Sequence, residues 1–256
     1  MLTSLNNAVS GVRAQMLRMD TLGNNIANVN TEAYKKNRTN FKDIFYRQTQ
    51  GPGLPVGENV MTGSGVVVSG TEKLFMQGSI LSTDRGLDFA IEGPGFFGLD
   101  LPDGSVGYTR NGNFNLDGEG FLVNQDGLRI YPYIQLPPEA GTPKVDREGR
   151  INIEGEGEFW DDPDIIELFH VPNPSGMEAV GEGVFVETEA SGFVSLGFPG
   201  EEGLGYIKQG SLEQSNVDLG EEMVEMILAQ RSFQLNTQTI RTADEMWELA
   251  NNLRRA

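Results

Sequence analysis

The sequence predicts an α+β protein: a discontinuous coiled-coil domain from N- and C-terminal helices, with an inserted mainly-β domain. Three observations predict this class. An apolar seam with coiled-coil spacing begins the chain, a second seam ends it, and the middle carries short strand and turn signals without helical periodicity. The predicted domains are 1–34 plus 212–256 for the terminal helices, 35–70 for an extended connecting segment, and 71–211 for the inserted β domain.

The N-terminal seam steps by three and four residues without a break from Leu2 to Ile26. This is the spacing of a coiled-coil helix. Gly23 occupies one seam position, and a small residue there predicts the close approach of another helix. The Asn residues that follow tolerate left-handed backbone, so they predict where the helix ends.

Helical periodicity is absent from the connecting segment, 35–70. A short apolar cluster, which includes Phe41 and Ile44, is followed by a run rich in Gly and Pro. Such a run predicts extended or looped chain. We therefore expect no helix between 35 and 70.

Short strand candidates alternate with turn signals through the middle of the chain. The turn signals are Pro102-Asp103-Gly104, Asn111-Gly112, Asp117-Gly118 and Asp126-Gly127. Their spacing predicts a small β barrel or sandwich. The strand candidates lie at 88–91, 95–99, 108, 114–116, 121–123, 165–171 and 183–187.

The C-terminal helix is predicted over 218–254. Asp218 is placed to cap its first turn, and Glu221 to reciprocate. At about 1.5 Å per residue the helix would be roughly 55 Å long. A rod of that length needs a partner of similar length, which favours a coiled coil over the core helix of an ordinary domain. Its large row is Leu219, Met226, Phe233, Ile240 and Trp247, and a second row, small after its first member, is Glu222, Ala229, Asn236, Ala243 and Ala250.

Charge and composition exclude several functions. The chain has 37 acidic and 19 basic residues, a net charge of −18, which opposes binding to nucleic acid or to anionic lipid. It has no Cys, and no apolar run approaches the ~20 residues that span a bilayer. The first residues lack the basic start and apolar block of a secretory signal peptide, so a protein that leaves the cytoplasm from this sequence should do so by another route and without cleavage.

Two motifs that suggest ligand sites are better explained by hairpins. The run 93–98 fits the dinucleotide pattern G-x-G-x-x-G, but a strand signal follows it, and Pro94 lacks an amide donor. Asn113 to Asp117 resembles the start of a calcium loop. That loop requires Asp first and Glu twelfth, whereas Asn113 and Asn124 stand there. We expect no cofactor and no metal.

Two other features are assigned structural roles. The acidic run from Glu154 to Asp164 predicts a solvated loop. His170, the single histidine, lies in a strand-like stretch without the neighbours of a catalytic triad. No spacing among the many carboxylates selects a catalytic pair. We therefore expect no enzyme.

Three separated runs, in the right order, resemble the bacterial flagellar rod and hook protein family. Run 4–36 is similar to its N-terminal signature and run 210–246 to its C-terminal signature. Run 71–127 resembles the same family and is most similar to its distal rod members. The resemblance covers well over half the chain, and 145–199 matches only loosely.

The resemblance implies a structural subunit that does no chemistry and self-assembles through its terminal helices into a torque-transmitting tube. Implied partners are copies of itself, adjoining flagellar rod and hook proteins, and surrounding ring proteins where present. The implied location is the flagellar basal body, in the periplasmic part of the cell envelope, reached by flagellar export. The predicted polymer interface comprises Leu5, Val9, Val12, Met16, Met19, Ile26, Leu219, Met226, Phe233, Ile240 and Trp247.

Two alternative functions stay open on the sequence alone. The nearer is another axial member of the same family, a proximal rod or a hook protein, although hook proteins are usually longer. The more distant is a carbohydrate- or calcium-binding β module on a helical stalk. Titration with calcium or glycan distinguishes the latter, because a rod subunit should show no stoichiometric site.

Overall fold

The described residues form two α-helices, toward the ends of the chain, and a mainly-β middle, which confirms the predicted α+β class. The chain forms two compact units. The first comprises Met1–Val29, Lys36–Leu74 and Val217–Ala256, and the second Asn30–Lys35 and Phe75–Asn216. The computed structural model describes residues 2–44, 47–49, 60–136, 143–152, 165–201 and 203–255.

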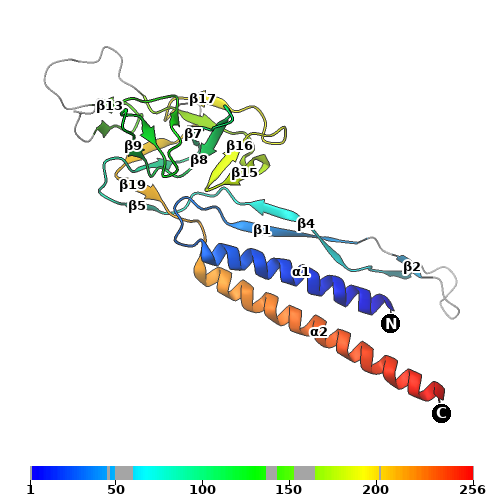
Figure 1. Cartoon of the computed structure of the whole chain (residues 1–256). Coiled ribbons are helices and arrows are strands. Elements are labelled where there is room, and N and C mark those ends of the chain that lie inside the picture. The colour runs from blue at the N-terminus through cyan, green and yellow to red at the C-terminus, as the bar shows by residue number, and fades with distance from the viewer. Residues whose placement is uncertain are drawn as a thin grey trace, which may run out of the picture. The chain divides into compact units, whose positions relative to one another are not determined.

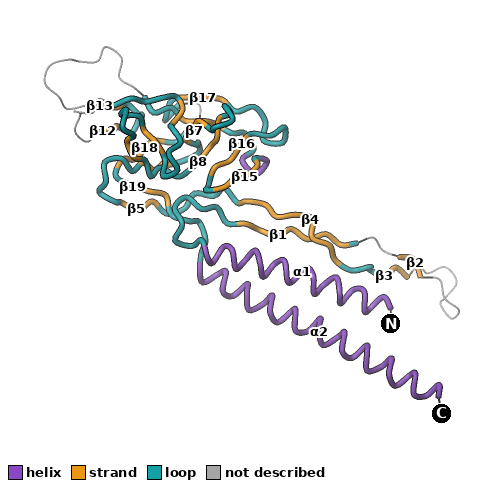
Figure 2. The backbone as a smooth tube through the Cα atoms, in the orientation of Figure 1, coloured by secondary structure: helices purple, strands orange, loops and turns teal. Residues whose placement is uncertain are grey.

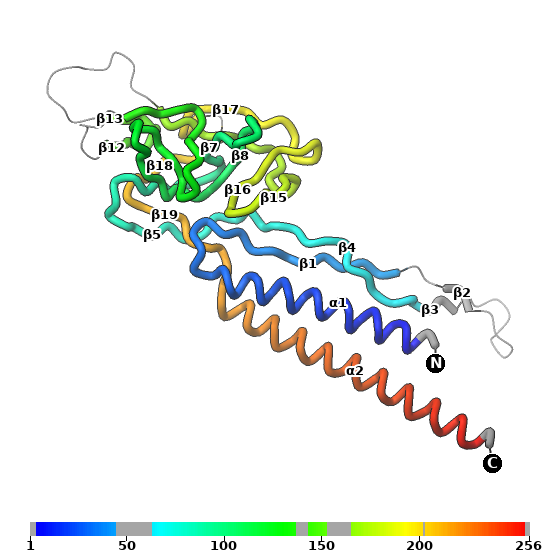
Figure 3. Tube along the Cα trace, viewed as in Figure 1, coloured from blue at the N-terminus to red at the C-terminus, as the bar shows by residue number. Residues whose placement is uncertain are grey.

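Two antiparallel helices dominate the first unit. Helix α1 (Leu2–Ala27) and helix α2 (Leu219–Arg255) lie side by side, so the N-terminal and C-terminal segments of the chain pack together (Figure 1). The rainbow colouring of Figure 3 sets blue α1 against orange and red α2. Both helices agree with the predicted ranges to about one residue. With 37 residues against 26, α2 continues past the N-terminal end of α1.

A two-stranded ribbon runs along α1 in the same unit. Strand β1 (Asn37–Asp43) pairs antiparallel with β4 (Val66–Lys73), and the register shifts between Asn40 and Phe41. The Thr39 hydroxyl donates to the Thr21 hydroxyl at 2.9 Å, which joins the ribbon to the helix. Further along, β2 (Arg47–Thr49) pairs with β3 (Val60–Thr62).

The second unit is built from short strands linked by turns, as the colouring of Figure 2 shows. Its largest sheet has five strands in the order β11-β7-β8-β16-β15, and every pairing in it is antiparallel. Those strands are β7 (Phe97–Asp100), β8 (Val106–Thr109), β11 (Ile130–Tyr131), β15 (Glu178–Gly181) and β16 (Val184–Val186). The paired strands around it are β5 (Ile80–Ser82) with β19 (Ser211–Glu213), β6 (Phe89–Glu92) with β18 (Tyr206–Gln209), β9 (Asn115–Leu116) with β10 (Leu122–Val123), β12 (Lys144–Val145) with β13 (Ile151–Asn152), and β14 (Leu168–His170) with β17 (Ser195–Gly197); a 3₁₀ turn covers Pro174–Gly176.

The five-stranded sheet has an apolar core on each face. Phe97 and Leu99 alternate with Gly98 along β7, so they enter the larger core on one side. On the other side, a Cβ at Gly98 would lie 2.4 Å from the ring of Phe169. That ring belongs to the second core with Phe96. The second unit therefore carries apolar cores of its own.

Most predicted turns form, and one turn signal has another cause. Asp117 heads a tight loop because its Oδ1 accepts the amides of Glu119 and Phe121, each at 2.9 Å. Asn124 and Asp146 head equivalent loops. No backbone turn forms at Asn111-Gly112, although Asn111 Oδ1 accepts the amide of Asn113 at 3.1 Å. A Cβ at Gly112 would lie 1.7 Å from the carbonyl oxygen of Phe89, so this glycine permits close backbone contact.

Candidate functional site

Small side chains allow α1 and α2 to approach closely. Ala14 on α1 and Ala229 on α2 are both buried. A Cβ at Gly11 would lie only 2.8 Å from Nδ2 of Asn236. A Cβ at Gly23, by contrast, has no described atom within 4 Å. The close approach predicted at Gly23 is therefore made at Gly11 within the chain, and α2 turns its small row toward α1.

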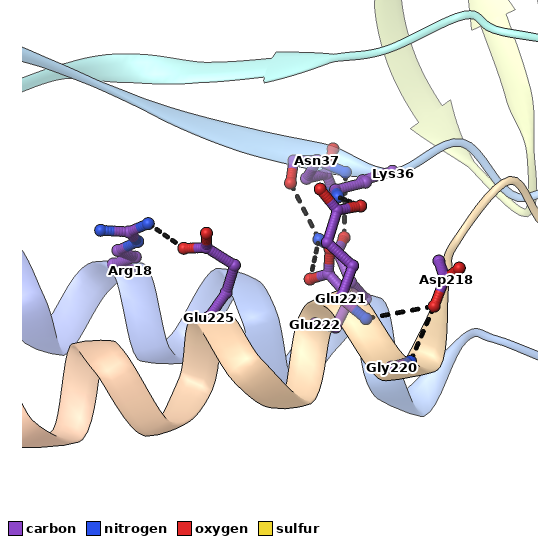
Figure 4. Close-up of polar contacts among 9 residues, drawn as sticks. Arg18, Lys36, Asn37, Asp218, Gly220, Glu221, Glu222 and Glu225 are labelled. Carbon is purple, nitrogen blue, oxygen red and sulfur yellow. Dashed lines mark hydrogen bonds and ion pairs between the residues drawn. The ribbon is translucent and has the colours of Figure 1, made fainter.

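A polar cluster, here called the helix clamp, joins α1, β1 and α2 (Figure 4). It consists of Asn25, Lys36 and Glu222. Asn25 bonds the backbone of Asn37 twice, at 2.9 Å each, and its Nδ2 also donates to Glu222 Oε2 at 3.0 Å. Lys36 Nζ lies 2.6 Å from Glu222 Oε1. Since the Glu222 side chain is 0% exposed, these two partners compensate its buried charge.

Lys36 also holds a second carboxylate, and its ionisation reflects both. Its Nζ lies 3.0 Å from Glu221 Oε2, so Glu221 turns to Lys36 rather than back to the cap. Desolvation of Lys36 opposes its charged form, but the hydrogen bonds that Lys36 donates to Glu222 and Glu221 outweigh it. The pKa of Lys36 is therefore raised above its ordinary value.

Asp218 caps the start of α2 as its sequence predicts. Asp218 Oδ1 accepts the amide of Gly220 at 2.8 Å and that of Glu221 at 3.1 Å. Figure 4 shows both bonds beside the helix clamp. The cap satisfies amides that the first turn leaves without helical partners.

The large residues of the predicted interface keep part of their surface in the single chain. Buried positions on α2 are Glu222, Ala229 and Ala243, all from its second row. Half-buried members of the predicted interface are Leu5, Val12, Met19, Ile26, Met226, Phe233 and Ile240, and exposed members are Val9, Met16, Leu219 and Trp247.

Helix α2 exposes more apolar surface than its large row contains. Leu235 is 65% exposed and Leu253 is 80% exposed. These positions are absent from the predicted interface because they lie outside the seven-residue rows on which it was based. The signal is present, since apolar residues occur on α2 outside both rows. The exposed apolar residues outside the rows are Met223, Val224, Ile227, Leu228, Leu235, Met246, Leu249 and Leu253.

The motifs considered for ligand binding have structural partners. Run 93–98 connects β6 to β7, and no helix follows it. Arg85 donates to the side-chain oxygens of Asn113 and Asn115, which begin the calcium-like pattern. His170 ends β14. Among the described residues no group of three or more His, Asp or Glu is arranged to hold a metal, and the predicted loop 154–164 lies outside them.

Three family models match the chain in separate parts. One is described as "Flagella basal body rod protein" and matches residues 5–35. The second is the "Flagellar hook protein FlgE/F/G D1 domain", at residues 90–153. The third is the "Flagellar basal body rod FlgEFG protein C-terminal", at residues 208–253. The first and third fall on the two terminal helices.

Curated relatives match the chain over its full length. Flagellar basal-body rod protein FlgG of Borreliella burgdorferi is 39% identical, with all of both chains covered. FlgG of Bacillus subtilis is 38% identical with the same coverage. The flagellar hook-basal body complex protein FlhP of Bacillus subtilis is 30% identical, over 99% of this chain and all of its own. No described helix combines the length and the apolar character of a membrane span.

Proposed function

This chain belongs to the FlgG family of flagellar basal-body rod proteins, and from that premise we propose that it self-assembles through its terminal helices into a torque-transmitting tube. It is a structural subunit of the flagellar distal rod. In the proposed assembly, the small row of α2 pairs with α1 inside each subunit. The large rows of both helices then form coiled-coil contacts between subunits.

The observation that carries this proposal is the difference in burial between the small row and the large row of α2. The small row is already buried, at Ala229 and Ala243, while Trp247 of the large row is half-exposed. Exposed apolar side chains on a helix favour an interaction site there. Full burial of one large apolar side chain contributes roughly 1.5–3 kcal/mol. Repeated along a helix and around a tube, such contacts suffice for stable assembly.

The remaining parts of the chain are assigned supporting roles. We propose that the β domain predicted at 71–211 is an inserted domain that decorates or stiffens the outside of the tube. The adjoining partners are other rod and hook proteins, and ring proteins surround the rod where present. The proposed location is the periplasmic part of the basal body, reached through the flagellar export channel. The subunit carries load and catalyses no reaction.

The alternative functions have less support. Within Bacillus subtilis, identity is 38% to FlgG and 30% to FlhP, which favours the distal rod over another axial role. A calcium-binding β module would need free oxygen ligands. In the candidate loop, Arg85 occupies the oxygens of Asn113 and Asn115.

Electron microscopy and light scattering of the purified protein test self-assembly. At high concentration we expect rods whose formation is promoted by added salt, because neighbouring copies each carry a charge of −18. Screening is substantial once the Debye length falls to about 8 Å near physiological ionic strength. Neutral osmolyte at equal osmolality is the control. Assembly that weakens steadily with salt would contradict the expectation and indicate that specific ion pairs dominate the contacts.

A further inference from the structure

A buried charged cluster in the second unit has two cations and one carboxylate. Lys35 Nζ lies 2.5 Å from Glu213 Oε1, and Arg110 Nη1 lies 3.6 Å from Glu213 Oε2. The Gly78 amide also donates to Glu213 Oε1, at 2.8 Å. Exposed fractions are 1% for the Lys35 side chain, 0% for Glu213 and 7% for Arg110. Lys35 therefore makes the closer of the two ion pairs with Glu213.

In this cluster, two donor atoms of Arg110 make no hydrogen bond to the described residues. Within the described part of the chain, its Nε and Nη1 have no hydrogen-bond partner, and neither has Glu213 Oε2. A guanidinium carries five N–H donors in a planar fork. Buried polar groups are nearly always hydrogen-bonded, so each orphaned donor needs an explanation. The guanidinium carbon also lies 5.2 Å from the centre of the Phe96 ring.

Arg110 lines a pocket of about 270 Å³ in the same unit. Gln77 fixes one wall, because it donates to the Ile91 carbonyl at 3.0 Å and accepts the Gly93 amide at 3.1 Å. Gly93 and Gly95 both line the pocket with positive φ, 115° and 133°, a backbone that other residues rarely adopt. The shape of this wall is therefore fixed by the Gln77 hydrogen bonds and by the two glycines.

The chemistry of the lining selects an anion with an apolar stem. Arg110 and His170 supply cationic or donor groups, and Phe75 and Phe96 supply apolar surface. None of the described lining residues is acidic, although acidic residues outnumber basic ones 37 to 19 in the chain. Planar carboxylates match the fork of Arg. A pocket of this volume is below the usual range for drug-sized ligands, about 300–1,000 Å³, and suits a single side chain.

We propose that this pocket receives an acidic side chain, Glu or Asp, from a second copy of this chain, with its carboxylate on Arg110. The choice of a second copy rests on the proposed function, which packs many copies together, and on the excess of carboxylates that each copy carries. The pocket would give the β domain a subunit contact separate from the helical interface.

Propionate, which reproduces the end of a Glu side chain, is the probe for the site itself. Because His170 is the single histidine, isotope-labelled protein gives one imidazole signal from the pocket wall. Titration of dilute protein at fixed pH, with chloride as the matched anion, should shift that signal saturably. Arg110→Lys keeps the charge beside Glu213 but lacks the fork, so it should weaken binding several-fold. Arg147→Gln, at an exposed arginine of the same unit, should leave binding unchanged.

The source of the carboxylate is tested by assembly. Propionate at concentrations that saturate the His170 signal should slow rod formation relative to chloride, and Arg110→Lys should slow it without propionate. Absence of a saturable shift overturns the site. A shift with unchanged assembly overturns the second copy as its source. Wild-type protein that forms no rods in salt contradicts the proposed function instead, and leaves the propionate titration to judge the pocket.

Discussion

Replacing Phe233 by Asp is expected to abolish rod assembly. Phe233 belongs to the large row of α2 and is half-buried in the single chain, so assembly would place the new carboxylate in an apolar contact. Truncation of a buried Phe costs about 3–5 kcal/mol, and a buried unpaired charge can cost more. In a polymer that cost recurs at every subunit. Sedimentation of assembled material from soluble protein measures the effect.

The matched control places the same charge one residue away. Gln234 is an exposed polar residue of α2, so Gln234→Asp should assemble nearly normally. A second readout separates the two parts of the chain. The imidazole signal of His170, the single histidine and part of β14, should report the same denaturant midpoint with and without Phe233→Asp. A sharp fall in that midpoint would mean that the helices and the β region unfold as one core.

Replacing Glu222 by Ala should destabilise the helical unit by about 3–5 kcal/mol, the usual effect of removing one partner from a buried ion pair. Glu222 is fully buried, and its loss leaves Lys36 and Asn25 without their shared acceptor. Denaturant unfolding followed by far-ultraviolet circular dichroism measures the loss.

The raised pKa of Lys36 determines the pH range over which its ion pair with Glu222 stabilises the helical unit. The stabilisation is fully present below the ordinary value of 10.5 and is lost as pH rises through the higher folded value, so variant and wild type should converge there.

Glu225 provides a control on the same helix. It pairs with Arg18 of α1, but the two side chains are 34% and 35% exposed. Exposed ion pairs contribute roughly 0–1 kcal/mol, so Glu225→Ala should have a small effect. Equal losses in the two variants would indicate that the helix clamp has no special role and that any α1–α2 ion pair is equivalent.

The extent of both helices could be predicted from sequence because their periodicity is long and unbroken. The seam that ends at Ile26 and the cap at Asp218 place the helix ends within about one residue of the observed ones. Periodicity identifies apolar rows but does not say which row meets which partner. Ala229 and Ala243 are buried on the inner side of α2, but in the sequence only their small size was apparent.

Contacts that depend on the three-dimensional path of the chain could not be predicted. Gly112 reads as a turn residue beside Asn111, whereas it is needed because the backbone of Phe89 passes close by. Lys35 reads as a surface residue at the end of a helix, yet it is buried against Glu213, far away in the sequence. Nothing in the sequence around Gly112 or Lys35 indicates which distant residue each will contact. The predicted subunit interface itself stays a prediction, since it involves other copies of the chain.

Thiol labelling of assembled rods tests the central claim, that the large apolar rows face neighbouring subunits. The chain contains no Cys, so Met16→Cys introduces a single thiol on an exposed residue of the N-terminal row, and Val180→Cys introduces one on exposed β15. In monomers both should react readily with a maleimide. In rods, Met16→Cys should become strongly protected while Val180→Cys stays reactive. A Met16→Cys thiol that reacts as fast in rods as in monomers would contradict assembly through these helices.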